Sequence, residues 1–88
     1  MRQVWKYRIP PQDHQTLSVP KGSQFLHFAL QDDQPNLWFL VDPSTDMETR
    51  ELRLAGTGQN IWEENLTYVG TAVGHMGQFV WHLFEVRP

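Results

Sequence analysis

The sequence predicts an all-β fold, either a small antiparallel sandwich or an open barrel, with about seven short strands. Hydrophobic residues recur at every second position along most of the chain, which is the period of a strand. Proline, glycine, asparagine and aspartate separate these segments at regular intervals. Helix signals are nearly missing, apart from Asn60, which could cap one short helical turn over residues 60–65. Because 88 residues supply one hydrophobic core, residues 1–88 are expected to form a single domain.

The first two strands are predicted near the N-terminus. Residues 4–9 alternate, since Trp5, Tyr7 and Ile9 share one face and two basic residues take the other. A pair of prolines ends this strand. Residues 15–19 are expected to form a second short strand, which stops at a Pro-Lys-Gly turn signature.

Three strands are predicted in the middle of the chain. Residues 24–31 and 36–41 are apolar on both faces, as in a sheet that is covered on two sides. The four residues Asp32–Pro35 connect them, so we expect an antiparallel hairpin. After a polar loop, residues 49–54 alternate again, with leucines on one face and charged residues on the other.

The last two strands are predicted at residues 66–73 and 78–86, joined by the loop Gly74–Gly77. Gly70 lies inside the first of them and indicates a β-bulge or a close approach of two backbones. Two histidines, His27 and His82, lie on predicted strands and could be cross-strand neighbours, although two ligands do not make a metal site. We therefore expect no metal and no cofactor.

Aromatic residues are the strongest unusual feature of the composition. The chain has four tryptophans, five phenylalanines and two tyrosines, and it has no cysteine, which excludes disulfides and thiolate metal sites. Neighbours on a strand point to opposite faces, so Trp38 and Phe39 cannot both enter one core. Homo-oligomerisation would cover the outward rings and would also stabilise so small a domain, so we expect self-association.

Charge and hydropathy argue against nucleic acid and membranes as partners. The net charge of −3 argues against nucleic acid as the main partner. The charge is uneven, because Arg2, Lys6 and Arg8 crowd the N-terminus while eight of the ten acidic residues lie within residues 32–64. No segment has the length of a membrane span, and the N-terminus lacks the apolar stretch of a signal peptide. We therefore expect a cytoplasmic protein with no membrane partner.

Five segments together resemble a family of small uncharacterised proteins of tailed bacteriophages and prophages. They are "VWKY", "LWFLVDP", "ETRELRLAGTGQNI", "LTYVGT" and "FVWHLFE", and they cover nearly the whole chain in the family's order. The resemblance implies a phage setting in the cytosol of a host cell, and it implies no activity. The family's loop reads Gly-Thr-Gly, Gln or His, any residue, then Ile, which matches residues 56–61. The resemblance implies that relatives often have His where this chain has Gln59, and if that His does acid–base work in them, the amide here counts against catalysis.

The glycine loop is the candidate ligand site. Successive backbone N–H groups in such a turn can form a nest for an anion. Two upstream arginines could neutralise a phosphate, and a tryptophan after the loop could stack on a base. The alternative is a turn that ends a strand, with the threonine bonded to local backbone and the tryptophan covering the end of the sheet. The candidate residues are Arg50, Arg53, Gly56, Thr57, Gly58, Gln59, Asn60 and Trp62.

No pattern in the sequence supports an enzyme. The chain has no G-x-S-x-G elbow and no closely spaced pair of histidines, and its adjacent carboxylates diverge. We therefore expect a non-enzymatic, self-associating phage accessory protein that sequesters a small anionic, nucleotide-type ligand, such as a signal of bacterial defence. Two alternatives remain open, an interaction module that blocks a host defence protein and a minor virion or assembly component.

Overall fold

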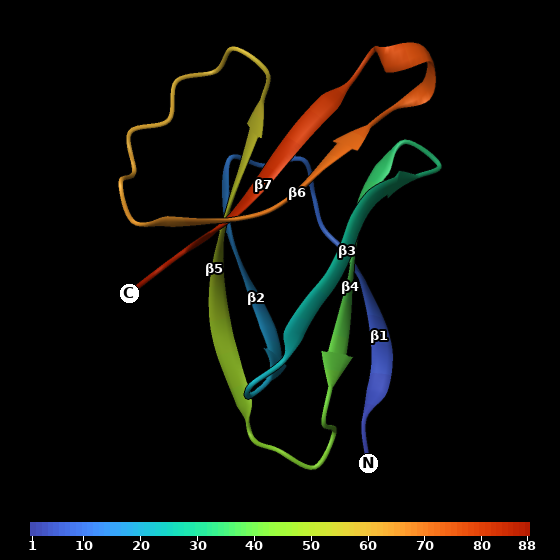
Figure 1. Cartoon of the computed structure of the whole chain (residues 1–88), viewed down its shortest axis with the longest axis vertical. Helices are drawn as coiled ribbons and strands as arrows, with labels where there is room; N and C mark the ends of the chain where they lie inside the picture. Colours follow the sequence, from blue (N-terminus) through green and yellow to red (C-terminus); the bar gives the residue numbers. More distant parts are fainter.

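A computed structural model describes residues 1–88 and confirms the all-β prediction. Seven antiparallel strands form two sheets, one 3-10 turn is the only helical element, and no closed barrel is present (Figure 1). No helix in this fold has the length and apolar character that crossing a bilayer requires. In chain order the elements are β1 (Gln3–Arg8), β2 (His14–Pro20), β3 (Gln24–Gln31), β4 (Gln34–Val41), β5 (Met47–Gly56), β6 (Leu66–Val73), η1 (His75–Gly77) and β7 (Val80–Val86).

The two sheets have three and four strands. The three-stranded sheet has the order β1-β4-β3, and the four-stranded sheet has the order β2-β5-β7-β6. Along one side of the sandwich β3 lies against β6 without pairing to it (Figure 1). The approach is close, because a Cβ atom on Gly70 would lie 3.3 Å from the Cβ of Phe28. The close approach predicted at Gly70 is therefore confirmed. The predicted bulge is also present, because β6 shifts register between Tyr68 and Gly70.

The hydrophobic core lies between the sheets and is built by alternate residues of the strands. Phe39 is at its centre, with the Tyr7 ring edge-on at 5.5 Å and the Phe25 ring at 4.5 Å. Trp38 points to the opposite face, where it is half-buried beside the His27 ring at 5.7 Å. Burying each large core side chain contributes about 1.5–3 kcal/mol. The buried cluster consists of Ile9, Val19, Phe28, Leu37, Phe39, Val41, Leu52, Leu54, Ala72 and Leu83.

The connection between β3 and β4 is shorter than the predicted four residues. Only Asp32 and Asp33 lie between the strands, and their φ angles of 53° and 59° are those of a type I′ turn. β4 therefore starts at Gln34 and contains Pro35, which is buried. The proline is tolerated because β1 ends at Arg8, so no ladder bond needs its missing N–H, while its carbonyl accepts a hydrogen bond from the Ile9 N–H at 3.0 Å.

Two other expectations are wrong. The helical turn predicted over residues 60–65 does not form, because Arg53 binds the Asn60 carbonyl and the Glu63 carboxylate and holds this segment as an irregular loop. The one 3-10 turn lies instead at His75–Gly77. His27 and His82 are not cross-strand neighbours, because they belong to different sheets.

Candidate functional site

The glycine loop begins with a turn that is closed by its own glutamine. The Gln59 N–H donates to the Gly56 carbonyl at 3.1 Å, and Gly58 has a φ of +90°, as the third residue of a type II turn requires. The side chain of Gln59 folds back and accepts the Gly56 N–H at 2.8 Å. Two of the backbone donors expected to face an anion are therefore used inside the turn. Thr57 and Gly58 are exposed at its tip.

Arg53 lies under the loop and anchors it to β5. Its side chain is 5% exposed, and its Nε donates to Glu63 at 2.8 Å. Its two Nη atoms donate to the carbonyls of Leu54 and Asn60 at 2.6 and 3.0 Å. Burial would raise the pKa of Glu63, but the hydrogen bond from Arg53, a backbone hydrogen bond and the charges of Arg53 and His14 outweigh it and hold that pKa below its ordinary value. The Arg53 charge is thus neutralised within the protein.

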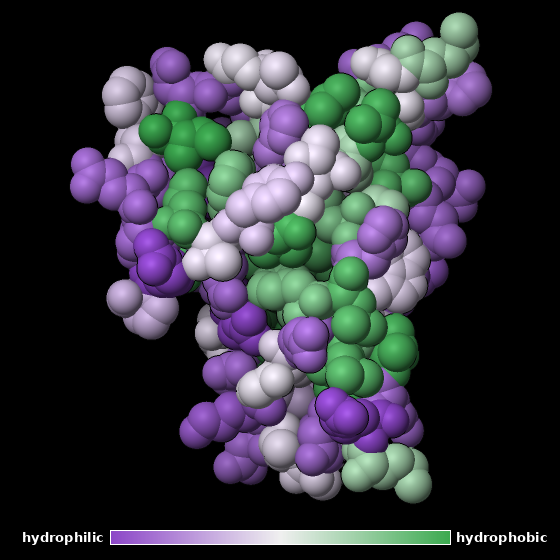
Figure 2. All heavy atoms as spheres, in the orientation of Figure 1, coloured by the Kyte–Doolittle hydropathy of each residue, from purple (hydrophilic) through white to green (hydrophobic).

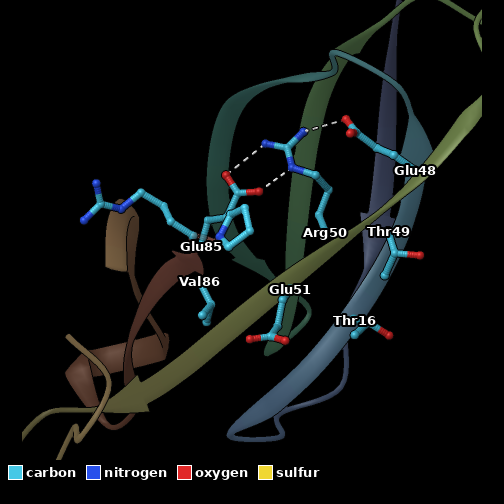
Figure 3. Close-up of a pocket in the computed structure, with 9 residues that line it drawn as sticks. Thr16, Glu48, Thr49, Arg50, Glu51, Glu85 and Val86 are labelled. Carbon is cyan, nitrogen blue, oxygen red and sulfur yellow. Dashed lines mark hydrogen bonds and ion pairs between the residues drawn. The ribbon is translucent and has the colours of Figure 1, made fainter. Parts of the chain in front are cut away.

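Arg50 lies away from the loop, at one end of the sandwich. Its guanidinium is seated between two carboxylates and binds Glu85 through both Nε and Nη2 (Figure 3). The third nitrogen donates to the Ser23 carbonyl at 2.9 Å and lies 3.6 Å from Glu48. The guanidinium also lies 5.0 Å from the centroid of the Phe25 ring. Arg50 therefore joins the two sheets, and the hydrogen bond to Glu85 raises its pKa above the ordinary value.

The groove beside Arg50 is the largest hollow on the surface, about 400 Å³. It lies between the first half of β5 and the C-terminal residues 85–88. It exists because β5 pairs with β7 only from Leu52 onward, whereas its earlier residues pair only with β2. The groove is lined mainly by charged and threonine side chains, several of them drawn in Figure 3. None of the residues of the glycine loop reaches it.

Trp62 neither covers the end of the sheet nor packs in the core, because 81% of its surface is exposed. The alternative explanation of the tryptophan as a cover is therefore wrong. Of the residues predicted for the ligand site, the structure gathers those from Gly56 to Asn60 and Trp62 in one loop, with Arg53 beneath it. Arg50 is not part of this group.

A chain of side-chain hydrogen bonds was missed by the sequence reasoning. The Thr57 hydroxyl lies 2.8 Å from His82 Nε2, and the Thr71 hydroxyl lies 3.0 Å from His82 Nδ1. The Tyr68 hydroxyl completes the chain at 2.6 Å from Thr71. These hydrogen bonds run from the glycine turn after β5 to β7 and then to β6, so they tie the turn to the sheet. No group of three or more His, Asp or Glu side chains is placed to hold a metal ion.

The outer side of β6 and β7 is a face without charged residues, which we call the hairpin face. Four cross-strand pairs build it, each with both side chains on the outside of the sandwich. None of these residues is Asp, Glu, Lys or Arg. Figure 2 shows hydrophobic side chains gathered at the upper right, where the β6–β7 hairpin lies, and continuing over β3 and β4. The pairs are Leu66 with Val86, Tyr68 with Phe84, Thr71 with His82, and Val73 with Val80.

Comparison with known proteins adds a family but no activity. No curated protein and no solved structure gives a significant match to this chain. The family model that matches carries the description "Domain of unknown function (DUF7352)", and the match covers residues 1–88. Because the match spans the full sequence, the chain belongs to this family of uncharacterised domains.

Proposed function

We propose that this protein is a non-enzymatic binding module that works by associating with protein surfaces, and first of all with copies of itself. One observation carries the proposal: the chain exposes ten large hydrophobic residues, whereas its buried core cluster of 10 residues contains nine large ones and Ala72. A monomeric soluble protein scatters a few such residues over its surface, and larger apolar patches mark interaction sites. The exposed residues are Met1, Val4, Leu26, Met47, Ile61, Trp62, Tyr68, Val73, Met76 and Phe79.

Two properties of the fold support self-association. An antiparallel sheet with one solvated face normally has polar residues outside, and the hairpin face departs from this pattern. A domain of this size also has little core to offset the entropy of folding, so contact with further copies adds stability. Light scattering coupled to size exclusion, over a range of loading concentrations, tests the proposal. A mass that stays at 10.3 kDa throughout contradicts it.

The same exposed faces support a partner other than the protein itself. The resemblance to phage proteins makes a host defence protein in the cytosol the natural target, and a minor virion or assembly role is the other setting. Affinity capture with the full chain tests the first idea, and mass spectrometry of purified particles tests the second. One stoichiometric partner that a variant with a charged hairpin face no longer captures would support blocking of a host protein.

A second candidate function is sequestration of a small anionic, nucleotide-type ligand by the loop 56–62. The observation in its favour is the exposed indole of Trp62, on a loop that Arg53 holds in place. Since both arginines are paired within the protein, a phosphate would depend on the backbone N–H groups of Thr57 and Gly58. Isothermal titration with cyclic and ADP-ribose nucleotides tests it, with Trp62→Ala as the variant. Absence of heat from the whole panel rejects this candidate.

A further inference from the structure

The hairpin face differs from the other half of the same sheet. On the outer side of β2 and β5 most residues are polar or charged, as expected for a solvated face, for example Thr16, Ser18 and Glu51, and the apolar residues of β5 on this side are Met47 and Ala55. On the outer side of β6 and β7 they are apolar or uncharged, and Tyr68 and Val73 remain 59% and 61% exposed. Both halves belong to the same four-stranded sheet, so the loss of charged residues from the outer side is specific to β6 and β7.

We infer that the hairpin face is the surface through which two copies of this chain associate, face to face about a two-fold axis. The inference rests on the self-association proposed above and names its surface. In a two-fold contact each face meets an identical face, so here apolar residues meet apolar residues and no charge is buried. An ordinary protein surface rich in Lys, Glu and Asp would lose the hydration of its charges against this face without gaining a partner for them.

The polar groups on the hairpin face are already satisfied within one copy. His82 has a threonine hydroxyl at each ring nitrogen, and Tyr68 is bonded to one of these threonines. Leaving a buried polar group without a partner costs about 1–3 kcal/mol, which is the usual obstacle to covering such residues. The hydrogen bonds that link Thr57, His82, Thr71 and Tyr68 already satisfy these polar groups within one copy. The hairpin face can therefore lose its water without the cost of an unpaired polar group. This feature separates it from a surface that merely happens to be apolar.

The outer face of the three-stranded sheet is a weaker candidate. It exposes Val4 and Leu26, but the same side of β1 carries Lys6 and Arg8. Two such faces in contact would bring like charges together unless they were offset. The groove along β5 is also charged and is already crossed by the ion pairs of Arg50.

The size of the hairpin face sets the expected strength of association. Eight residues at about 3.4 Å per residue span roughly 27 Å, and two strands with their side chains are roughly 10 Å wide. The area is therefore about 300 Å² per copy, below the roughly 800 Å² per partner of a stable complex. We therefore expect a weak dimer that dissociates on dilution and not a permanent one.

Two matched substitutions test the surface. Val73→Lys places a charge on the hairpin face, and Val4→Lys places the same charge on the outer face of the other sheet, at nearly the same exposure of 61% and 58%. Sedimentation equilibrium is measured for the wild-type chain and both variants, and far-UV circular dichroism verifies that each variant is folded. We expect Val4→Lys to associate like the wild type and Val73→Lys to associate at least about tenfold more weakly.

The possible outcomes separate the surface from the proposed function. If the wild type dimerises and Val73→Lys dimerises equally well, the hairpin face is not the interface, although self-association still holds. A wild-type chain that is monomeric at every concentration overturns the proposed function itself. Salt provides a measurement that needs no variant, because an uncharged interface should not weaken as salt is raised. Marked weakening of the wild-type dimer by salt would point to the charged face and against the hairpin face.

Discussion

Replacing Arg50 with methionine tests what holds the two sheets together at the end of the sandwich. Arg50 and Glu85 belong to the four-stranded sheet, whereas Ser23 and Phe25 lead into and lie on the three-stranded one. Methionine keeps most of the apolar stem and removes the guanidinium. The substitution therefore removes the bidentate pair with Glu85, the hydrogen bond to the Ser23 carbonyl and the contact with the Phe25 ring.

The expected loss follows from the exposure of the pair. Exposed ion pairs contribute about 0–1 kcal/mol, and removing one partner of a buried pair costs about 3–5 kcal/mol. The side chains of Arg50 and Glu85 are 16% and 21% exposed, which is nearer the buried limit, although some solvent screening remains. We expect Arg50→Met to lower the free energy of unfolding by about 2–4 kcal/mol. For a domain of this length the total is only about 4–13 kcal/mol, so the effect is large.

Urea denaturation followed by tryptophan fluorescence measures the effect. The protein concentration must be kept fixed, because association of the folded chain adds to its apparent stability. Lys6→Met is the control, since Lys6 is exposed and is hydrogen-bonded only to Gln31, and its expected effect is within about 0.5 kcal/mol. The double variant Arg50→Met/Glu85→Gln should lose less than the sum of the two single losses. A loss below about 0.5 kcal/mol for Arg50→Met would refute the idea that this pair joins the sheets.

Three further predictions concern the loop and the hairpin turn. Arg53→Met should speed hydrogen exchange of the backbone amides in residues 56–65 while the amides of β1 and β4 are unchanged, and an unchanged loop would exclude Arg53 as its anchor. The folded-state pKa of Glu63 is lowered, so its contribution is present above the ordinary value of 4.5 and is lost as the pH falls through the folded value. The stability difference between the wild type and Glu63→Gln should therefore shrink below about pH 4.5, and a constant difference would contradict the pairing. Changing Asp32 and Asp33 to Asn-Gly suits the type I′ turn better and should raise the unfolding free energy by about 0.5–1 kcal/mol in the same urea assay, whereas a decrease would argue against this turn.

The strands could be predicted because alternation is a local property of the sequence. Trp5, Tyr7 and Ile9 do face the core, and Trp38 and Phe39 do point to opposite faces. The type of the β3–β4 turn is harder to predict from the sequence, because Pro35 indicates a connection of four residues instead of two. Only the three-dimensional structure shows that Pro35 can lie within β4, where its carbonyl accepts the hydrogen bond from Ile9.

The candidate ligand site was less predictable, for two different reasons. The ligand-site prediction places Arg50 and Arg53 together, but residues at an odd separation along a strand point to opposite faces, so alternation alone separates the two side chains. The hydrogen bonds of His82 to Thr57 and Thr71 could not be derived from the sequence, since they require the strand order β5-β7-β6 and its register. No single segment of the sequence contains that information.

The order of the strands also determines how the chain can fold during synthesis. Only β3–β4 and β6–β7 join neighbours in sequence, so these two hairpins can form as soon as each emerges. The pairs β1–β4, β2–β5 and β5–β7 close longer loops and must form later. Until β7 has been made, β5 has an unpaired edge and the core lacks Leu83. A newly made chain therefore stays exposed to aggregation and proteolysis until its last strand arrives.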